Sequence, residues 1–162
     1  MEFRDFIVRE MTLAHAESLL TGKLDGVDSL GIMTPTNPEA QRLSHAENQR
    51  LKQAFVAQLR QQGHGPVKLG GKFGNREESY LIENISREEM VRLGAQFRQE
   101  SVIWGQKVNG PKGPTFRFEY IEGNVTKAVR DTVLIGPSVD SRRDNYSTFH
   151  GHKFVIPFFD KR

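Results

Sequence analysis

Cysteine is absent from the 162 residues, and no hydrophobic run approaches the roughly 20 residues that cross a membrane as a helix. The absence of cysteine excludes disulfide bonds, thiolate zinc sites and a cysteine nucleophile, and it suits a reducing cytoplasm. Charged residues also interrupt the N-terminal segment from Glu2 to Glu10, unlike the pattern of a signal peptide. The sequence therefore predicts a cytoplasmic protein that does not associate with membranes.

Common catalytic and cofactor motifs are also missing. The chain has no Walker phosphate loop, no HExxH metal motif and no serine in a nucleophile elbow. His150 and His152 are two residues apart, but a zinc ion would need at least one further ligand, for which Asp160 is a candidate. We predict no metal site and no cofactor, and the sequence leaves open whether the protein is an enzyme.

The charge of the chain is nearly balanced. Its formal net charge is only +3, although the sequence pI is about 9.3, and basic residues form no run. This balance permits an anionic partner without requiring one, and it weakens nucleic-acid binding as a function. Phe116, Phe118 and Tyr120 alternate with polar residues and could stack on bases, but such a strand more commonly faces a core.

A pattern of strand, capped helix and strand occurs twice over residues 29–104. In each copy a serine, Ser44 or Ser86, stands three residues before a glutamate and just before an apolar stripe. This capping box predicts that the two serines begin helices. Short apolar runs on either side of each helix predict strands. The predicted strands cover residues 29–34, 67–69, 79–82 and 101–104.

The order of these elements predicts an α+β fold, specifically a ferredoxin-like split βαβ sandwich with a βαββαβ core. In that arrangement the first two strands run parallel, the third lies antiparallel between them, and the fourth lies beside the first. We expect a single domain over residues 1–162. It would comprise a helical segment at 1–22, the core at 29–104 and a β extension at 115–159, with Gly22 ending the N-terminal helix.

Glycine and proline predict the connections between these elements. The segments predicted as loops are Gly70–Arg76, Gly105–Pro114 and Pro137–Tyr146. The strands predicted in the β extension are residues 116–120, 125–135 and 153–159. Pro157 favours an edge position for the last strand, because proline cannot donate a ladder hydrogen bond.

The predicted topology gathers polar segments at one end of the sheet. The C-terminal ends of the first two strands, the N-terminal ends of the last two and the N-terminus of the first long helix meet there, and helix N-termini attract anions. Glu78 is the candidate catalytic acid or base. The candidate ligand-binding residues are Asn37, Asn48, Lys72, Arg76 and Gln99. We expect Asn37, Glu78 and Gln99 to converge on one cavity beside the loop that carries the two cations.

Each candidate also has a structural alternative. Asn37 precedes a proline and could simply form a turn. Asn48 lies on the apolar stripe of its helix, so we expect it to be largely buried and bonded to the strand end around residues 34–37. Glu78 could be a solvated carboxylate at a strand start, and Gln99 could cap the chain before a strand. The glycine-rich loop could wrap a phosphate or serve only as a flexible connection.

Four short polar segments occur in a particular order and spacing: Thr34–Pro38, Glu47–Asn48, Glu77–Ser79 and Phe97–Val102. Together they resemble a family of small bacterial and phage proteins known as domain of unknown function three-two-nine-three. The resemblance covers roughly residues 29–104. Arg98 stands where a small residue, usually glycine, is expected from the resemblance. The resemblance implies a prokaryotic or phage origin and a shared polar cluster, and it supplies no activity.

These observations favour a small protein that binds an anionic, phosphorylated or nucleotide-like ligand at this end of the sheet, with a hydrolytic reaction as a further expectation. In that hypothesis Lys72 and Arg76 contact the phosphate, while Asn37 and Gln99 orient the ligand. The alternative is a non-catalytic interaction or assembly protein of a bacterium or phage, either a component of the particle or an anti-defence factor. Its partner would be a protein, and its location could be the phage particle.

Overall fold

The computed structural model describes residues 13–73, 75–76, 78–135, 145–149 and 152–158. Three α-helices, one 3-10 helix and ten strands are assigned in this part of the chain. The helices are α1 (Leu13–Leu20), η2 (Pro38–Ala40), α2 (His45–Gln61) and α3 (Arg87–Gln96). The strands are β1 (Ser29–Met33), β2 (Val67–Phe73), β3 (Asn75–Arg76), β4 (Ser79–Glu83), β5 (Ser101–Gly110), β6 (Gly113–Glu122), β7 (Val125–Arg130), β8 (Leu134–Ile135), β9 (Asn145–Phe149) and β10 (His152–Val155).

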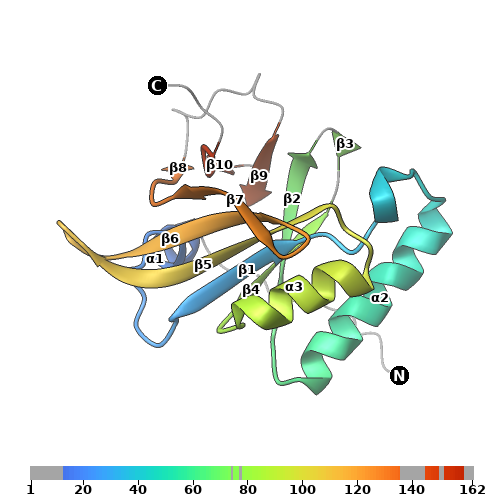
Figure 1. Ribbon diagram of the computed structural model, residues 1–162, viewed down its shortest axis with the longest axis horizontal. Helices are drawn as coiled ribbons and strands as arrows, with labels where there is room; N and C mark the ends of the chain where they lie inside the picture. Colours follow the sequence, from blue (N-terminus) through green and yellow to red (C-terminus); the bar gives the residue numbers. More distant parts are fainter. Residues whose placement is uncertain (1–12, 74, 77, 136–144, 150–151, 159–162) are drawn as a thin grey trace.

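The strands form one sheet in the order β7-β6-β5-β1-β4-β2-β9-β10-β8, with β3 paired to β2 (Figure 1). The pairs along this sheet are antiparallel. The predicted α+β class is therefore confirmed. At the centre, β5, β1, β4 and β2 have the neighbours and directions expected from the sequence. The sheet extends beyond them at both sides, so it is larger than a four-stranded sandwich.

Helices cover both faces of the central strands. On one face, α2 and α3 lie side by side (Figure 1) and bury Phe55, Leu59, Met90 and Leu93 against the sheet. On the other face, the C-terminal residues of α1 pack into a second cluster with side chains of β1, β2, β4, β6 and β10. Burial of these apolar side chains is the main driving force for the layered arrangement.

The two helices of the predicted repeat begin where their capping boxes lie. The Ser44 side chain accepts a hydrogen bond from the Glu47 amide at 3.2 Å, and α2 follows directly. The Ser86 side chain accepts from the Glu89 amide at 3.1 Å at the start of α3. Each serine satisfies an amide that has no partner inside its helix. Both predicted helix starts are confirmed.

Two segments predicted as loops are strands. Strand β2 continues through Gly70 and Gly71 to Phe73, because β9 pairs with its second half. Strands β5 and β6 form a long hairpin joined only through residues 111–112. Gly105 lies within β5, where a Cβ atom would stand 2.7 Å from Cδ1 of Phe118. The glycine therefore permits a close approach of a buried ring, and the prediction of a turn there was wrong.

The remaining predictions for the ends of the chain are met in part. Helix α1 covers residues 13–20 of the predicted helical segment, and residues 1–12 lie outside the described part. Asn145 and Tyr146, predicted to be in a loop, belong to β9. Strand β10 has neighbours on both sides, so Pro157 follows an inner strand, and the predicted edge position was wrong. His150 and Asp160 also lie outside the described residues.

Strand β7 is the last of the described strands at one end of the sheet, and its pairing with β6 is irregular. Tyr120 of β6 is opposite Ala128, but the next residue, Ile121, is opposite Thr126. Lys127 is therefore an extra residue on β7, and such a bulge breaks the regular hydrogen-bond ladder.

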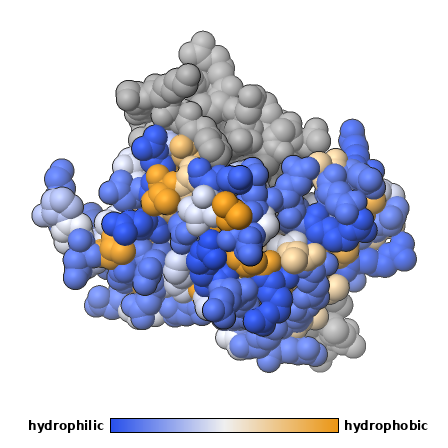
Figure 2. Space-filling model, viewed as in Figure 1, coloured by the Kyte–Doolittle hydropathy of each residue, from blue (hydrophilic) through white to orange (hydrophobic). Residues whose placement is uncertain are grey.

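The face shown in Figure 2 is mostly hydrophilic, with separate hydrophobic residues. No helix in the described residues is long and apolar enough to cross a membrane.

Candidate functional site

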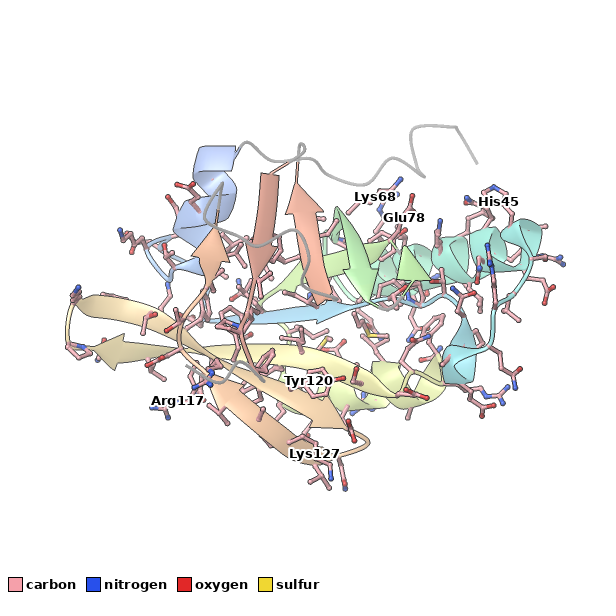
Figure 3. All side chains as sticks on the ribbon, turned by 90° about the horizontal axis from the view of Figure 1, so that it is seen from above. His45, Lys68, Glu78, Arg117, Tyr120 and Lys127 are labelled. Atoms are coloured by element: carbon pink, nitrogen blue, oxygen red, sulfur yellow. The ribbon has the colours of Figure 1, made fainter. Side chains whose placement is uncertain are left out.

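Glu78 forms ion pairs with two lysines from different elements. Its Oε2 atom lies 2.8 Å from the Nζ atom of Lys52, on α2, and its Oε1 atom lies 3.1 Å from the Nζ atom of Lys68, on β2. The Lys52 side chain is 15% exposed, whereas that of Lys68 is 52% exposed. Figure 3 shows Lys68 and Glu78 next to each other, with His45, the first residue of α2, farther away. The cluster therefore joins a helix and two strand ends around one carboxylate.

The two lysines keep Glu78 ionised. Partial burial by itself raises the pKa of the Glu78 carboxyl, but the hydrogen bonds and positive charges of Lys52 and Lys68 outweigh burial, so the pKa is lowered below its ordinary value. A carboxylate in this state accepts protons and hydrogen bonds, and it does not donate a proton at neutral pH. The expected acid role of Glu78 is therefore less suited to the site than the base role.

Tyr80 lies in the core next to the Glu78 cluster. Its ring is only 3% exposed and packs against Phe55 of α2, with the ring centroids 5.4 Å apart. Burial, and then the negative charge of Glu78, raise the pKa of the Tyr80 hydroxyl to about 12. The phenol therefore stays protonated across the physiological range. Because Glu78 and Tyr80 are two residues apart along an extended chain, their side chains point to the same face.

Asn37 and Asn48 form a reciprocal pair between the end of β1 and the first turns of α2. The Asn37 amide donates to Oδ1 of Asn48, and Nδ2 of Asn48 donates to Oδ1 of Asn37, both at 3.0 Å. Oδ1 of Asn37 also accepts from the amide of Leu43 at 3.0 Å. The predicted bond from Asn48 to the strand end is confirmed. Asn48 is also partly buried, in keeping with its place on the apolar stripe of α2.

Gln99 contacts the segment that follows β1. Its Nε2 atom donates to the backbone oxygen of Thr36 at 2.9 Å and to that of Phe97 at 3.1 Å. Thr36 is 4% exposed, and its hydroxyl pairs with that of Thr34 at 2.8 Å. These contacts hold the segment that leads from β1 to α2. The position of Gln99 thus agrees with the predicted topology, and its ligand-binding role stays a prediction.

The register of the sheet explains why these groups share one end. Met33, the last residue of β1, is opposite Tyr80 near the start of β4. Ser79, the first residue of β4, is opposite Leu69. Lys72 and Arg76, on which a phosphate-binding loop was predicted, are opposite each other in the β2–β3 hairpin. The segment is therefore a hairpin anchored to β9, and contact of these two cations with a ligand stays a prediction.

The two lysines that hold Glu78 were not predicted from the sequence. Lys52 lies one helical turn after Asn48, so both side chains lie on the same face of α2. Lys68 is opposite Tyr80 across the β2–β4 pair, so its side chain shares the face of Tyr80 and Glu78. Both spacings are present in the sequence, but they become informative only once the strand register is known. Within the described residues, no group of three or more His, Asp or Glu side chains could hold a metal ion.

Replacing Asn48 with alanine is expected to lower the free energy of unfolding by about 1–3 kcal/mol, because the Asn37 amide loses its acceptor and Oδ1 of Asn37 loses one of its donors in a partly buried position. The matched change Gln62→Ala, at the exposed C-terminal end of α2, should change it by less than about 0.5 kcal/mol. Urea denaturation of the two variants checks this. Equal midpoints would show that the asparagine pair contributes nothing to stability.

The candidate site lies within a segment that is similar to a known family. Residues 33–102 match the family described as "Protein of unknown function (DUF3293)". The resemblance predicted from the sequence is thereby confirmed. The matched segment contains Asn37, Asn48, Gln99 and the Glu78 cluster with both its lysines, whereas α1 and strands β6 to β10 lie outside it. No curated protein matches the chain.

Arg98, at which a small residue was expected from the resemblance, adopts a left-handed backbone conformation with φ 55°. Glycine enters this conformation without the strain that other residues experience. In this chain the strained turn is accompanied by an ion pair, in which the Nη2 atom of Arg98 lies 2.6 Å from Oε1 of Glu39. The Glu39 amide also donates to the Arg98 carbonyl at 2.7 Å. The arginine therefore links the α3–β5 turn to η2.

Proposed function

We propose that the protein binds a small anionic ligand, phosphorylated or nucleotide-like, at the end of the sheet where Lys52, Lys68 and Glu78 meet. The observation that supports this most directly is the ratio of charges. Two ammonium groups lie within 3.1 Å of a single carboxylate. The cluster therefore carries a net positive charge, and a positive cluster attracts anions and raises their local concentration.

The chemistry of the cluster suits oxyanions. Each ammonium group has three N–H donors, and one carboxylate cannot satisfy all of them. Lys68 extends its charged end into solvent, while Lys52 is mostly enclosed, so a ligand could approach past Lys68 towards Lys52. Tyr80 contributes a neutral phenol on the same face. Hydrogen bonds between ammonium donors and an anion are about twice as strong as neutral ones.

The asparagine pair gives the site a fixed geometry. Asn48 attaches the first turns of α2 to the end of β1, and Lys52 follows one turn later on the same helix face. In this proposal Asn37, Asn48 and Gln99 position the site, because their side chains are engaged with backbone groups and with each other. A hydrolytic reaction at this site would use Glu78 as a base, since its carboxyl group is ionised at neutral pH.

Isothermal titration calorimetry with inorganic phosphate and a panel of nucleotides tests the proposal. For any anion that binds, Lys52→Gln or Lys68→Gln should weaken affinity by about 10- to 100-fold, as expected for one lost charge-assisted contact of about 1.5–3 kcal/mol. Lys127→Gln is the matched control, because this exposed lysine lies on β7 at the far edge of the sheet (Figure 3). Thermal melting of each variant shows that the fold is retained.

Equal affinities in the two cluster variants and the control would contradict the proposed site. Failure of every anion to bind, with all proteins folded, would contradict anion binding itself. The interaction or assembly role predicted as the alternative would then be the remaining hypothesis.

A further inference from the structure

We propose that Glu78 is an internal competitor of the anion: in the ligand-free protein its carboxylate occupies the position between Lys52 and Lys68 that a ligand oxyanion would take. This inference rests on the proposed anion site and adds a statement about its regulation. The ligand would bind by displacing Glu78 from the two lysines. Glu78 would then limit affinity instead of contributing to it.

The geometry of the carboxylate supports this assignment. Glu78 uses one oxygen for each lysine, Oε2 for Lys52 at 2.8 Å and Oε1 for Lys68 at 3.1 Å. A phosphate or sulfate would present the same arrangement, with two oxygens on one central atom and each oxygen facing a different ammonium group. The Glu78 carboxylate therefore makes the contacts with the two lysines that two oxygens of the proposed ligand would make.

The surroundings of Glu78 allow it to leave while the rest of the cluster stays in place. Among the residues whose side chains are described, the charged and titratable groups that face it are Lys52 from α2, Lys68 from β2 and the protonated phenol of Tyr80 from β4. The Glu78 side chain is 35% exposed, so rotation can take its carboxylate into solvent. Tyr80, in contrast, is held in the core by its ring contact with Phe55.

Two consequences distinguish a competitor from a ligand-binding or catalytic carboxylate. Glu78→Gln preserves the size of the side chain and removes its charge, so affinity for an anion should rise by at least about tenfold, since a charge-assisted pair no longer has to be broken. Affinity of the unmodified protein should also rise as the pH falls through the lowered pKa of Glu78, because protonation removes the competing charge. The variant should not show this rise.

Calorimetric titration with sodium sulfate tests the proposal, since sulfate keeps its charge at the acidic pH values, below the ordinary pKa of a glutamate, at which Glu78 takes up its proton. The unmodified protein, Glu78→Gln and the control Glu122→Gln are compared at neutral pH and at a series of acidic pH values. Glu122 is exposed on β6, so the control makes the same change in net charge away from the cluster. At neutral pH we expect tighter sulfate binding only in Glu78→Gln. At acidic pH the affinity of the unmodified protein should approach that of Glu78→Gln.

The outcomes separate this inference from the proposed function. If the unmodified protein binds sulfate through the two lysines and Glu78→Gln binds equally or more weakly, the competitor role is overturned and the anion site stands. If neither protein binds, both proposals are overturned. Glu78→Asp provides a second test, because its shorter side chain keeps the charge but withdraws it from the lysines. Tighter binding in this variant supports the inference, and unchanged binding contradicts it.

Discussion

Replacing Phe55 with alanine is expected to destabilise the protein by about 3–5 kcal/mol, the usual cost of removing a fully buried aromatic side chain. Phe55 is 0% exposed and connects three elements. Its ring lies 5.4 Å from that of Tyr80 on β4 and 5.1 Å from that of Phe97 after α3, measured between centroids. The contact with Phe97 is edge-to-face, at 89°, which aromatic pairs favour.

Urea denaturation of the unmodified protein and of the variant measures this loss. Val129→Ala is the control, because Val129 is 48% exposed on β7 and should change stability by less than about 0.5 kcal/mol. Phe55→Leu should fall between the two, since it retains much of the buried volume. A loss of less than about 1 kcal/mol in Phe55→Ala would mean that the core rearranges to fill the space.

Gly22→Ala is expected to lower the free energy of unfolding by about 2–5 kcal/mol, from strain and overpacking together. Gly22 has φ 79° just after α1, where a side chain is strained. A Cβ atom there would also stand 2.7 Å from the Cα atom of Thr115 on β6. This contact is with backbone, which cannot rotate away as a side chain can.

Gly63→Ala separates the two causes. Gly63 has φ 86° after α2, but a Cβ atom there has open space around it. The control should therefore lose only the strain of about 1–2 kcal/mol. Thermal or urea denaturation of both variants gives the difference, which reports the contact with Thr115. Equal losses would show that the β6 backbone moves aside without cost.

Local signals in the sequence predicted the helices and the centre of the sheet well. Ser44 and Ser86 begin helices because a serine hydroxyl satisfies a free amide whatever the rest of the fold does. Gly22 ends α1, as predicted, in a left-handed conformation that glycine enters readily. Such signals depend on neighbours within a few residues, so they can be interpreted without knowledge of the tertiary structure.

Glycines within strands could not be interpreted in the same way. Gly70 and Gly71 are typical of a loop in sequence, yet they are paired with Thr148 and Ser147 of β9, a strand that was not predicted. A side chain at position 105 would collide with the ring of Phe118, which lies over Gly105. In both cases the decisive partner is distant in the chain, and the alternation of side chains does not reveal it.

The candidate site shows the same limit. Predicted topology placed Asn37, Glu78 and Gln99 at one end of the sheet, and the strand order agrees with that expectation. From the sequence, we expected Lys72 and Arg76 of the glycine-rich loop to be the cations beside Glu78, but Lys52 and Lys68 are the ones that contact it. Which lysine reaches a carboxylate depends on register and on the placement of a helix over the sheet. Neither is encoded in local spacing.

The irregular edge strand has a consequence for the behaviour of the protein in concentrated solution. Val125, Thr126 and Val129 give β7 a composition that favours strand pairing, and the outer edge of the strand has no neighbour among the described strands. Regular edges of this kind recruit other chains and begin aggregation. The extra residue at Lys127 twists the ladder and adds a charge in the middle of the strand. Deleting Lys127 would remove both the bulge and the charge in the middle of the strand, leaving only Arg130 at its end, and would open a route to intermolecular sheet growth.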